Sequence, residues 1–278
     1  MCTVHHHNLF DLAQRQLTRL RPKFISATFI PLMMEMTKNQ VMNRDALDKH
    51  TKLLVKQTRK GCCMELCLGC DANTEFKIAT MDNMHQNVMY ATENTSCCIR
   101  MICSSNRPFT ITLSEGGEKG GPVHSVHERP FAIPLGCFKC CCFQAIEVKS
   151  PTGAPLGKVI EDQWCFVPSF SVVDAKQSVQ YKIQQPTCAN GLCVDVCYDG
   201  FYNFPIPFLI YEPGKDTPGQ EVGQVVKVWS GLATELFTDA DNFELRFPAN
   251  ADAHTKTRLL GATFLINQLF FEGQKQKK

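Results

Sequence analysis

The sequence lacks a hydrophobic stretch long enough to cross a membrane easily. The best candidate, residues 259–271, is about 13 residues long and contains the polar pair Asn267 and Gln268. A membrane-spanning helix needs about 20 predominantly apolar residues, and polar side chains within it are costly. Length and polarity therefore favour a buried core helix over a membrane span, and we expect this helix at about residues 256–272.

An excess of charge of one sign is also lacking. Lys and Arg total 29 against 27 Asp and Glu in 278 residues, a formal net charge of +2. Whole-chain electrostatics therefore predict no nucleic-acid partner. Hydrophobic residues make up 44% and charged residues 20%, which excludes disorder throughout and allows one large domain or two modest ones.

Motifs of the familiar enzyme classes are missing. The sequence contains no Ser-His-Asp arrangement, phosphate-binding glycine loop, dinucleotide fingerprint or H-E-x-x-H. We therefore expect no covalent catalysis, and the missing phosphate loop agrees with a function that does not consume ATP.

No secretory leader is expected either, because Met1 is followed by His5, His6 and His7 and not by an apolar run. A reducing compartment is then the expectation. Cysteine, by contrast, is abundant, with 16 residues in clusters. In a reducing compartment these residues are interpreted as thiols, metal ligands or acylation sites.

The first 60 residues differ from the rest in their pattern of apolar and basic residues. Residues 8–21 interleave leucines with arginines, and Asn43 is placed to cap a second, basic helix that runs to Lys60. Such helices lie on anionic lipid or simply present a solvated face. We expect a basic leader over residues 1–60, partly helical or disordered, and a folded domain over residues 61–278.

From Glu75 onward, short segments rich in β-branched and aromatic residues recur between turn signals such as residues 150–153. The expected strands are residues 76–78, 88–90, 109–113, 145–148, 158–160, 170–173, 179–183, 192–197, 207–211, 225–229 and 243–247. About 11 or 12 strands and one terminal apolar helix predict a mainly β protein, an antiparallel barrel or sandwich plugged by the helix.

Specific blocks of residues accompany this pattern. The most distinctive is Phe-Thr-Asp-Ala-Asp-Asn-Phe at residues 237–243, which follows Trp229-Ser230-Gly231 and precedes Arg246-Phe247-Pro248 and the apolar segment 259–266. Upstream blocks are Cys97-Cys98, Arg107-Pro108-Phe109, Glu128-Arg129-Pro130, Cys140-Cys141-Cys142 and residues 144–148. In this order, over about residues 61–273, the sequence closely resembles the phospholipid scramblase family of the tubby-like superfamily.

The resemblance implies a tubby-like fold, an antiparallel β-barrel of about twelve strands around a buried C-terminal hydrophobic helix. It also implies calcium-responsive, ATP-independent scrambling of phospholipids in both directions between membrane leaflets, with no enzyme activity. Membrane phospholipids are then the partners, and the protein is expected at the cytoplasmic face of the plasma membrane or endomembranes. The chain would be lipid-anchored there, or single-pass if the C-terminal helix spans the membrane.

One alternative stays open beside this one. A membrane-tethered, tubby-like lipid-binding or adaptor module would share the fold and the anchor without scrambling lipids itself. Homo-oligomers are compatible with either function, and no nucleic-acid partner is expected.

The resemblance places calcium ligands at Asp239, Asp241, Asn242 and Asn250. An EF-hand loop needs an oxygen ligand at its fifth position, Gly at the sixth and Glu at the twelfth. Counted from Asp239, these positions hold Phe243, Glu244 and Asn250, and residues 243–247 alternate as a strand does. We therefore expect a weak calcium site in a turn, or an Asp-rich turn that caps a strand.

The cysteine run that is palmitoylated in the family matches Cys137, Cys140, Cys141 and Cys142. Two or more acyl chains make membrane attachment durable, whereas one chain anchors only marginally. Zinc binding is the alternative to acylation, because Cys67 and Cys70 form a C-x-x-C pair of possible zinc ligands. Three consecutive thiols suit a single metal ion poorly, so the run favours acylation.

Overall fold

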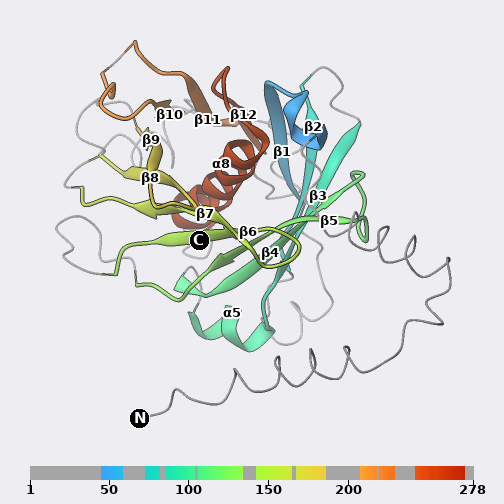
Figure 1. The fold of residues 1–278 in the computed structure, drawn as a ribbon. Helices are drawn as coiled ribbons and strands as arrows, with labels where there is room; N and C mark the ends of the chain where they lie inside the picture. Colours follow the sequence, from blue (N-terminus) through green and yellow to red (C-terminus); the bar gives the residue numbers. More distant parts are fainter. Residues whose placement is uncertain are drawn as a thin grey trace, which may run out of the picture. The chain divides into compact units, whose positions relative to one another are not determined.

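A closed ring of twelve β-strands forms the body of the part of the chain that the structure describes (Figure 1). The structure, a computed structural model, describes residues 45–58, 73–81, 86–103, 106–133, 142–164, 167–185, 207–217, 219–228 and 242–272. The chain divides into two compact units, residues 1–40 and 41–278, and every described residue belongs to the second.

Each strand pairs antiparallel with its neighbours in sequence, and the last strand returns to the first. The strands are β1 (Lys52–Thr58), β2 (Glu75–Thr80), β3 (Asn87–Asn94), β4 (Phe109–Glu115), β5 (Val123–Arg129), β6 (Ala145–Lys149), β7 (Pro155–Glu161), β8 (Ser169–Asp174), β9 (Val179–Gln184), β10 (Pro207–Tyr211), β11 (Gly223–Val228) and β12 (Asn242–Arg246). Pairing of Lys52 with Arg246 and of Lys56 with Asn242 joins β1 to β12. This closure removes the unpaired edges of the sheet, and it confirms the predicted antiparallel barrel.

Alternation along the strands sorts side chains between the core and the outside. On β12, Phe243 and Leu245 are buried, whereas Asn242, Glu244 and Arg246 are partly exposed. The strand character read from the alternation after Asn242 is confirmed. A loop of the EF-hand kind does not occupy this segment.

The C-terminal helix lies inside the ring of strands (Figure 1). It consists of α8 (Ala253–Ile266) and a wider final turn, η3 (Asn267–Glu272). Rings from the strands pack on its C-terminal half, with centroids 5.0 Å apart for Phe76 and Phe264 and 5.2 Å apart for Phe243 and Phe271. Leu265 is fully buried in this core. The predicted core helix at about residues 256–272 is confirmed, and no helix among the described residues has the length and apolar character needed to cross a membrane.

Two local features determine where α8 begins and how closely it packs against the strands. The Asp252 carboxylate accepts a hydrogen bond from the backbone N–H of Thr255 at 2.9 Å, which caps the helix. Further along, a Cβ at Gly261 would lie 2.9 Å from His127 Nδ1 and 3.2 Å from a methyl group of Val148. Glycine at this position therefore lets the helix backbone approach β5 and β6 closely.

Two sequence-based predictions are corrected by the structure. The basic helix expected from Asn43 to Lys60 is wrong, because only α3 (Asp45–Asp48) is helical there and β1 follows it. The leader predicted over residues 1–60 thus contains a strand of the barrel. Strand β5 was not predicted, because its inward side chains include Ser125 and His127 in place of apolar residues. The strand expected at 192–197 and the helix expected at 8–21 lie outside the described residues.

Candidate functional site

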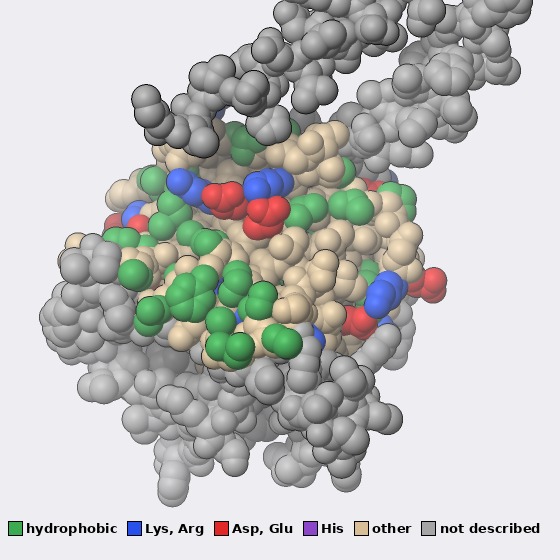
Figure 2. Space-filling view, turned by 90° about the horizontal axis from the view of Figure 1, so that it is seen from below, with side chains coloured by type: hydrophobic (Ala, Val, Ile, Leu, Met, Phe, Trp, Pro, Cys, Tyr) green, Lys and Arg blue, Asp and Glu red, His purple; other side chains and the backbone are tan. Residues whose placement is uncertain are grey.

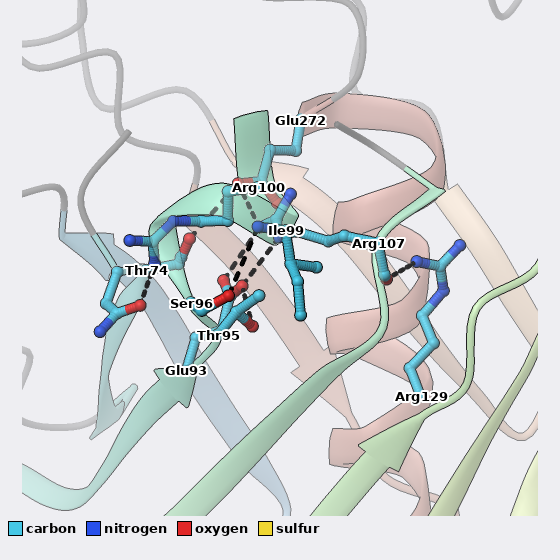
Figure 3. Close-up of polar contacts among 10 residues, drawn as sticks. Thr74, Glu93, Thr95, Ser96, Ile99, Arg100, Arg107, Arg129 and Glu272 are labelled. Atoms are coloured by element: carbon cyan, nitrogen blue, oxygen red, sulfur yellow. Dashed lines mark hydrogen bonds and ion pairs between the residues drawn. The ribbon is translucent and has the colours of Figure 1, made fainter. Parts of the chain in front are cut away.

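Three ionisable side chains are buried together where the central helix ends (Figure 3). The Arg107 guanidinium donates from Nε and Nη2 to the two carboxylate oxygens of Glu93, at 2.8 and 3.0 Å. The same Nη2 lies 3.0 Å from Glu272 Oε1, on the last residue of η3. The side chains of Arg107 and Glu93 are each only 3% exposed. This ion cluster ties the end of the helix to β3 and to the segment that leads into β4.

Both carboxylates of the ion cluster accept a further hydrogen bond. Thr95 donates to Glu93 at 2.9 Å, and Thr74 donates to Glu272 at 3.3 Å. Burial by itself raises the pKa of Glu93, but the hydrogen bonds and charge of Arg107 outweigh it and hold that pKa below its ordinary value. Burial likewise opposes ionisation of Arg107, and Glu93 and Glu272 more than compensate, so the pKa of Arg107 is raised. Glu93 and Arg107 therefore stay ionised inside the protein.

A second buried arginine extends this cluster across the barrel end. Arg129 donates from Nη1 to the backbone carbonyl of Arg107 and from Nη2 to Gln144 Oε1, both at 2.6 Å. Burial, together with the nearby charge of Arg107, lowers the pKa of Arg129 to about 10, so Arg129 is still protonated at neutral pH. Since Gln144 directly precedes β6, the ends of β5 and β6 and the approach to β4 are joined.

A groove of about 440 Å³ opens beside the ion cluster. It is lined by α5 (Cys97–Cys103), by the segment before β4 and by the ends of β5 and β6. Its lining includes the polar residues Thr95 and Ser96, the buried Arg129, and the apolar residues Ile99 and Phe109. A groove of mixed polarity suits a ligand that has both a polar and an apolar part.

Exposed apolar side chains gather on this end of the molecule, which Figure 2 shows from below. Ile99 and Ile102 on α5 are 37% and 79% exposed, and Phe131 and Ile133, which follow β5, are 54% and 46% exposed. Ile99 and Pro130, the neighbour of Phe131, line the same groove, so both pairs lie at one end of the barrel. We call these four side chains, Ile99, Ile102, Phe131 and Ile133, the apolar rim.

One of the predicted acylation cysteines falls within the described residues. Cys142 is exposed, has a left-handed backbone with φ of 61°, and precedes Gln144 at the start of β6. It therefore lies at the same barrel end as the apolar rim. The other three, Cys137, Cys140 and Cys141, lie outside the described residues, and acylation stays a prediction.

Of the predicted calcium ligands, Asn242 and Asn250 are described, and Asp239 and Asp241 lie outside the described residues. Asn242 is the first residue of β12, whereas Asn250 is exposed in the turn that follows the other end of this strand. The structure does not bring these two side chains together. Within the described ranges no three His, Cys, Asp or Glu side chains are grouped to hold a metal ion. Calcium and zinc both stay predictions.

The opposite end of the barrel, where α8 begins, is built from polar contacts. Lys256 Nζ donates to the backbone carbonyls of Leu47, Asp48 and His50 at 3.1, 3.0 and 2.9 Å. Arg258 donates to the carbonyl of Leu156 at 2.8 Å. A second groove, of about 470 Å³, lies here and is lined by Arg258 together with Asn250, Asp174, Lys176 and Gln180.

Sequence reasoning did not assign a role to the ion cluster or to the apolar rim. A signal for the cluster was present, because Glu272 directly follows two phenylalanines at the end of an apolar helix and needs a buried cation. A signal for the rim was present too. The segment 97–103 contains one charged residue, Arg100, and its apolar positions 98, 99 and 102 are spaced as on one helix face.

Comparison with known proteins agrees with this architecture. Residues 30–273 match the model of the Scramblase family. Phospholipid scramblase 1 of Rattus norvegicus is 34% identical over 209 residues, which cover 75% of this chain and 57% of that protein. Phospholipid scramblase 1 of Homo sapiens is 33% identical over 220 residues, covering 77% and 62%. No solved structure matches the chain.

The protein belongs to the Scramblase family, since the family match covers most of its length. The chain spans only 57% to 62% of these two relatives. More distant relatives include phospholipid scramblase family member 5 of Homo sapiens, which is 28% identical over 210 residues, covering 74% of this chain and 69% of that protein.

Proposed function

We propose that this protein moves phospholipids in both directions between the leaflets of a membrane, without ATP and in response to calcium. The support is the match of residues 30–273 to the Scramblase family and the similarity to proteins named as phospholipid scramblases. Movement of a lipid down its own gradient makes and breaks no covalent bond. Such a function therefore requires neither a nucleophile nor an acid–base pair.

The filled barrel restricts the path that a lipid would take. Core side chains of α8 and η3, from Leu259 to Phe271, pack against the strands from inside, so the barrel axis offers no passage for a headgroup. The path that we propose runs over the outer surface. The groove beside α5 would contact the headgroup through Thr95 and Ser96 and would contact the apolar part through Ile99.

Calcium is proposed to act through Asp239 and Asp241, which precede β12 in sequence, together with Asn242. Asn250 lies beyond the other end of β12 and would reach the same ion only after a rearrangement. Few charged ligands make a weak site, so we expect a dissociation constant of roughly 10⁻⁴ to 10⁻³ M. Asp239→Ala combined with Asp241→Ala should abolish calcium-dependent scrambling and leave membrane attachment intact. An unchanged calcium response in this variant would show that Asp239 and Asp241 do not bind the calcium that controls scrambling.

Attachment to the cytoplasmic leaflet is proposed to depend on acyl chains carried by Cys137, Cys140, Cys141 and Cys142. Changing residues 140–142 to Ser should release the protein to the soluble fraction, since a hydroxyl cannot carry a thioester. Cys98→Ser, a change at an exposed thiol on α5, is the matched control and should stay attached. Attachment of the wild-type protein that resists hydroxylamine would contradict acylation.

A flip assay with the full chain in phosphatidylcholine vesicles tests the proposed activity. Dithionite bleaches a fluorescent phospholipid in the outer leaflet only, so scrambling exposes the inner pool. We expect bleaching beyond that of protein-free vesicles, with calcium present and ATP absent. Bleaching equal to that of protein-free vesicles would favour the second candidate, a membrane-tethered adaptor, for which the filled interior of the barrel is the supporting observation.

A further inference from the structure

The apolar rim stands out from the rest of the described surface. Six large apolar side chains are markedly exposed among the described residues, and the other two are Val123 and Val179. The four rim residues lie at the barrel end where the helix terminates, whereas Val123 and Val179 each begin a strand at the opposite end. Such a concentration of exposed apolar side chains marks an interaction surface.

The rim is also firmly supported from beneath. Ile99 and Ile102 are three residues apart on α5 and so project from one helix face. Phe131 and Ile133 leave the barrel directly after Arg129, which is fixed by its bonds to Arg107 and Gln144. The rim therefore consists of two separate protrusions on a rigid base.

Several features match a lipid surface as the occupant. Cys142, which belongs to the run proposed to carry acyl chains, is exposed on the same end. Helix α5 carries Arg100 and no acidic residue, and the intervening sequence 134–141 also contains no acidic residue. The acidic side chains Glu128 and Glu147, which line the groove, are paired with Lys149 at 2.5 and 3.5 Å. Glu128 and Glu147 share this one lysine, and Arg100 on α5 balances the remaining charge, so these groups together carry no net charge toward anionic headgroups.

We propose that the apolar rim is a membrane-docking surface, whose Ile99, Ile102, Phe131 and Ile133 side chains insert among the lipids of the leaflet that the protein contacts. This inference rests on the proposed function and adds a fixed orientation to it. The groove beside α5 then faces the headgroups, and the polar end where α8 begins faces away from the membrane. Two separate protrusions suit a fluid bilayer, which adapts to both without a complementary shape.

The test measures vesicle binding by the full chain, produced without acylation so that docking is separated from anchoring. Co-sedimentation is measured with vesicles of phosphatidylcholine and with vesicles that also contain phosphatidylserine. Ile102→Ser combined with Phe131→Ser should weaken binding at least about ten-fold, since burying one such side chain contributes that much. The matched control, Val123→Ser with Val179→Ser, should bind as the wild type does. Melting temperatures of both variants confirm that they are folded.

Four results would overturn the docking surface. These are no binding by the wild-type chain, unchanged binding by the rim variant, equal loss in the control variant, and conversion of a dimer to a monomer in the rim variant with vesicle binding unchanged. The flip assay separates this inference from the proposed function. Rim-dependent binding without scrambling would refute scrambling alone, and scrambling with rim-independent binding would refute the docking surface alone.

Discussion

The two ends of the central helix are held by different chemistry. Where α8 begins, the Lys256 ammonium group donates to three backbone carbonyls, which carry no net charge and can accept hydrogen bonds from water instead. Where η3 ends, Arg107 is neutralised by Glu93 and Glu272, and all three are buried. The surface above the first end is polar, and the surface above the second carries the apolar rim. The comparison indicates that the end where α8 begins is suited to contact with water, and that the end with the apolar rim is suited to contact with an apolar partner.

The largest effect is expected from a charge placed inside the barrel, between the two ends. Leu265→Asp buries a carboxylate with no partner, which costs several kcal/mol and should abolish folding. Ile102→Asp is the control, because Ile102 is 79% exposed and its replacement should leave the fold intact. Circular dichroism and thermal melting distinguish the two outcomes. A folded Leu265→Asp variant would show that the helix is not the core of the barrel.

The next largest effect is expected at the end with the apolar rim. Arg107→Met leaves Glu93 and Glu272 buried together without their shared cation. Breaking a buried ion pair in this way costs about 3–5 kcal/mol. Urea denaturation measures the loss, and a change below about 1 kcal/mol would contradict the ion cluster described here.

The same substitution at the polar end should cost less. Lys256→Met leaves three neutral carbonyls without a donor, at a cost of about 1–3 kcal/mol. Measured by the same denaturation, the Lys256 variant should be the more stable of the two. The reverse order would remove the distinction between the two ends.

The smallest effect is a dependence of stability on pH, which arises from the buried His127 between the two ends. Burial, aided by the charge of His124, lowers the pKa of His127 to about 3. An unfolded histidine takes up its proton first, so stability falls as the pH drops below the ordinary histidine value. This residue accounts for about 1 kcal/mol between pH 7 and pH 5.5. His127→Gln should flatten the stability profile in that range, and an unchanged slope would assign it to other groups.

The barrel and its core helix could be predicted from local pattern, because strands such as β12 alternate Phe243 and Leu245 with polar residues. Strand β1 was mistaken for a helix, since Lys52 and Lys56 are four residues apart and flank three consecutive apolar residues. Strand β5 was missed because Ser125 and His127 occupy inward positions.

The ion cluster and the apolar rim depend on contacts between distant parts of the chain. Arg107 and Glu272 are 165 residues apart in sequence, and only closure of the barrel brings them together. A short apolar segment such as α5 has the same sequence pattern whether it is buried or exposed. Its exposure follows from its position outside the barrel end, which no local pattern reveals.

Hydrogen–deuterium exchange of the full chain, with and without phosphatidylcholine vesicles, tests most directly whether only the end with the apolar rim contacts the membrane. We predict that vesicles slow amide exchange in α5 and in residues 131–133 and leave the turn between β8 and β9, residues 175–178, unchanged. Slower exchange at residues 175–178 with no change in α5 would contradict the assignment of the apolar rim to the membrane.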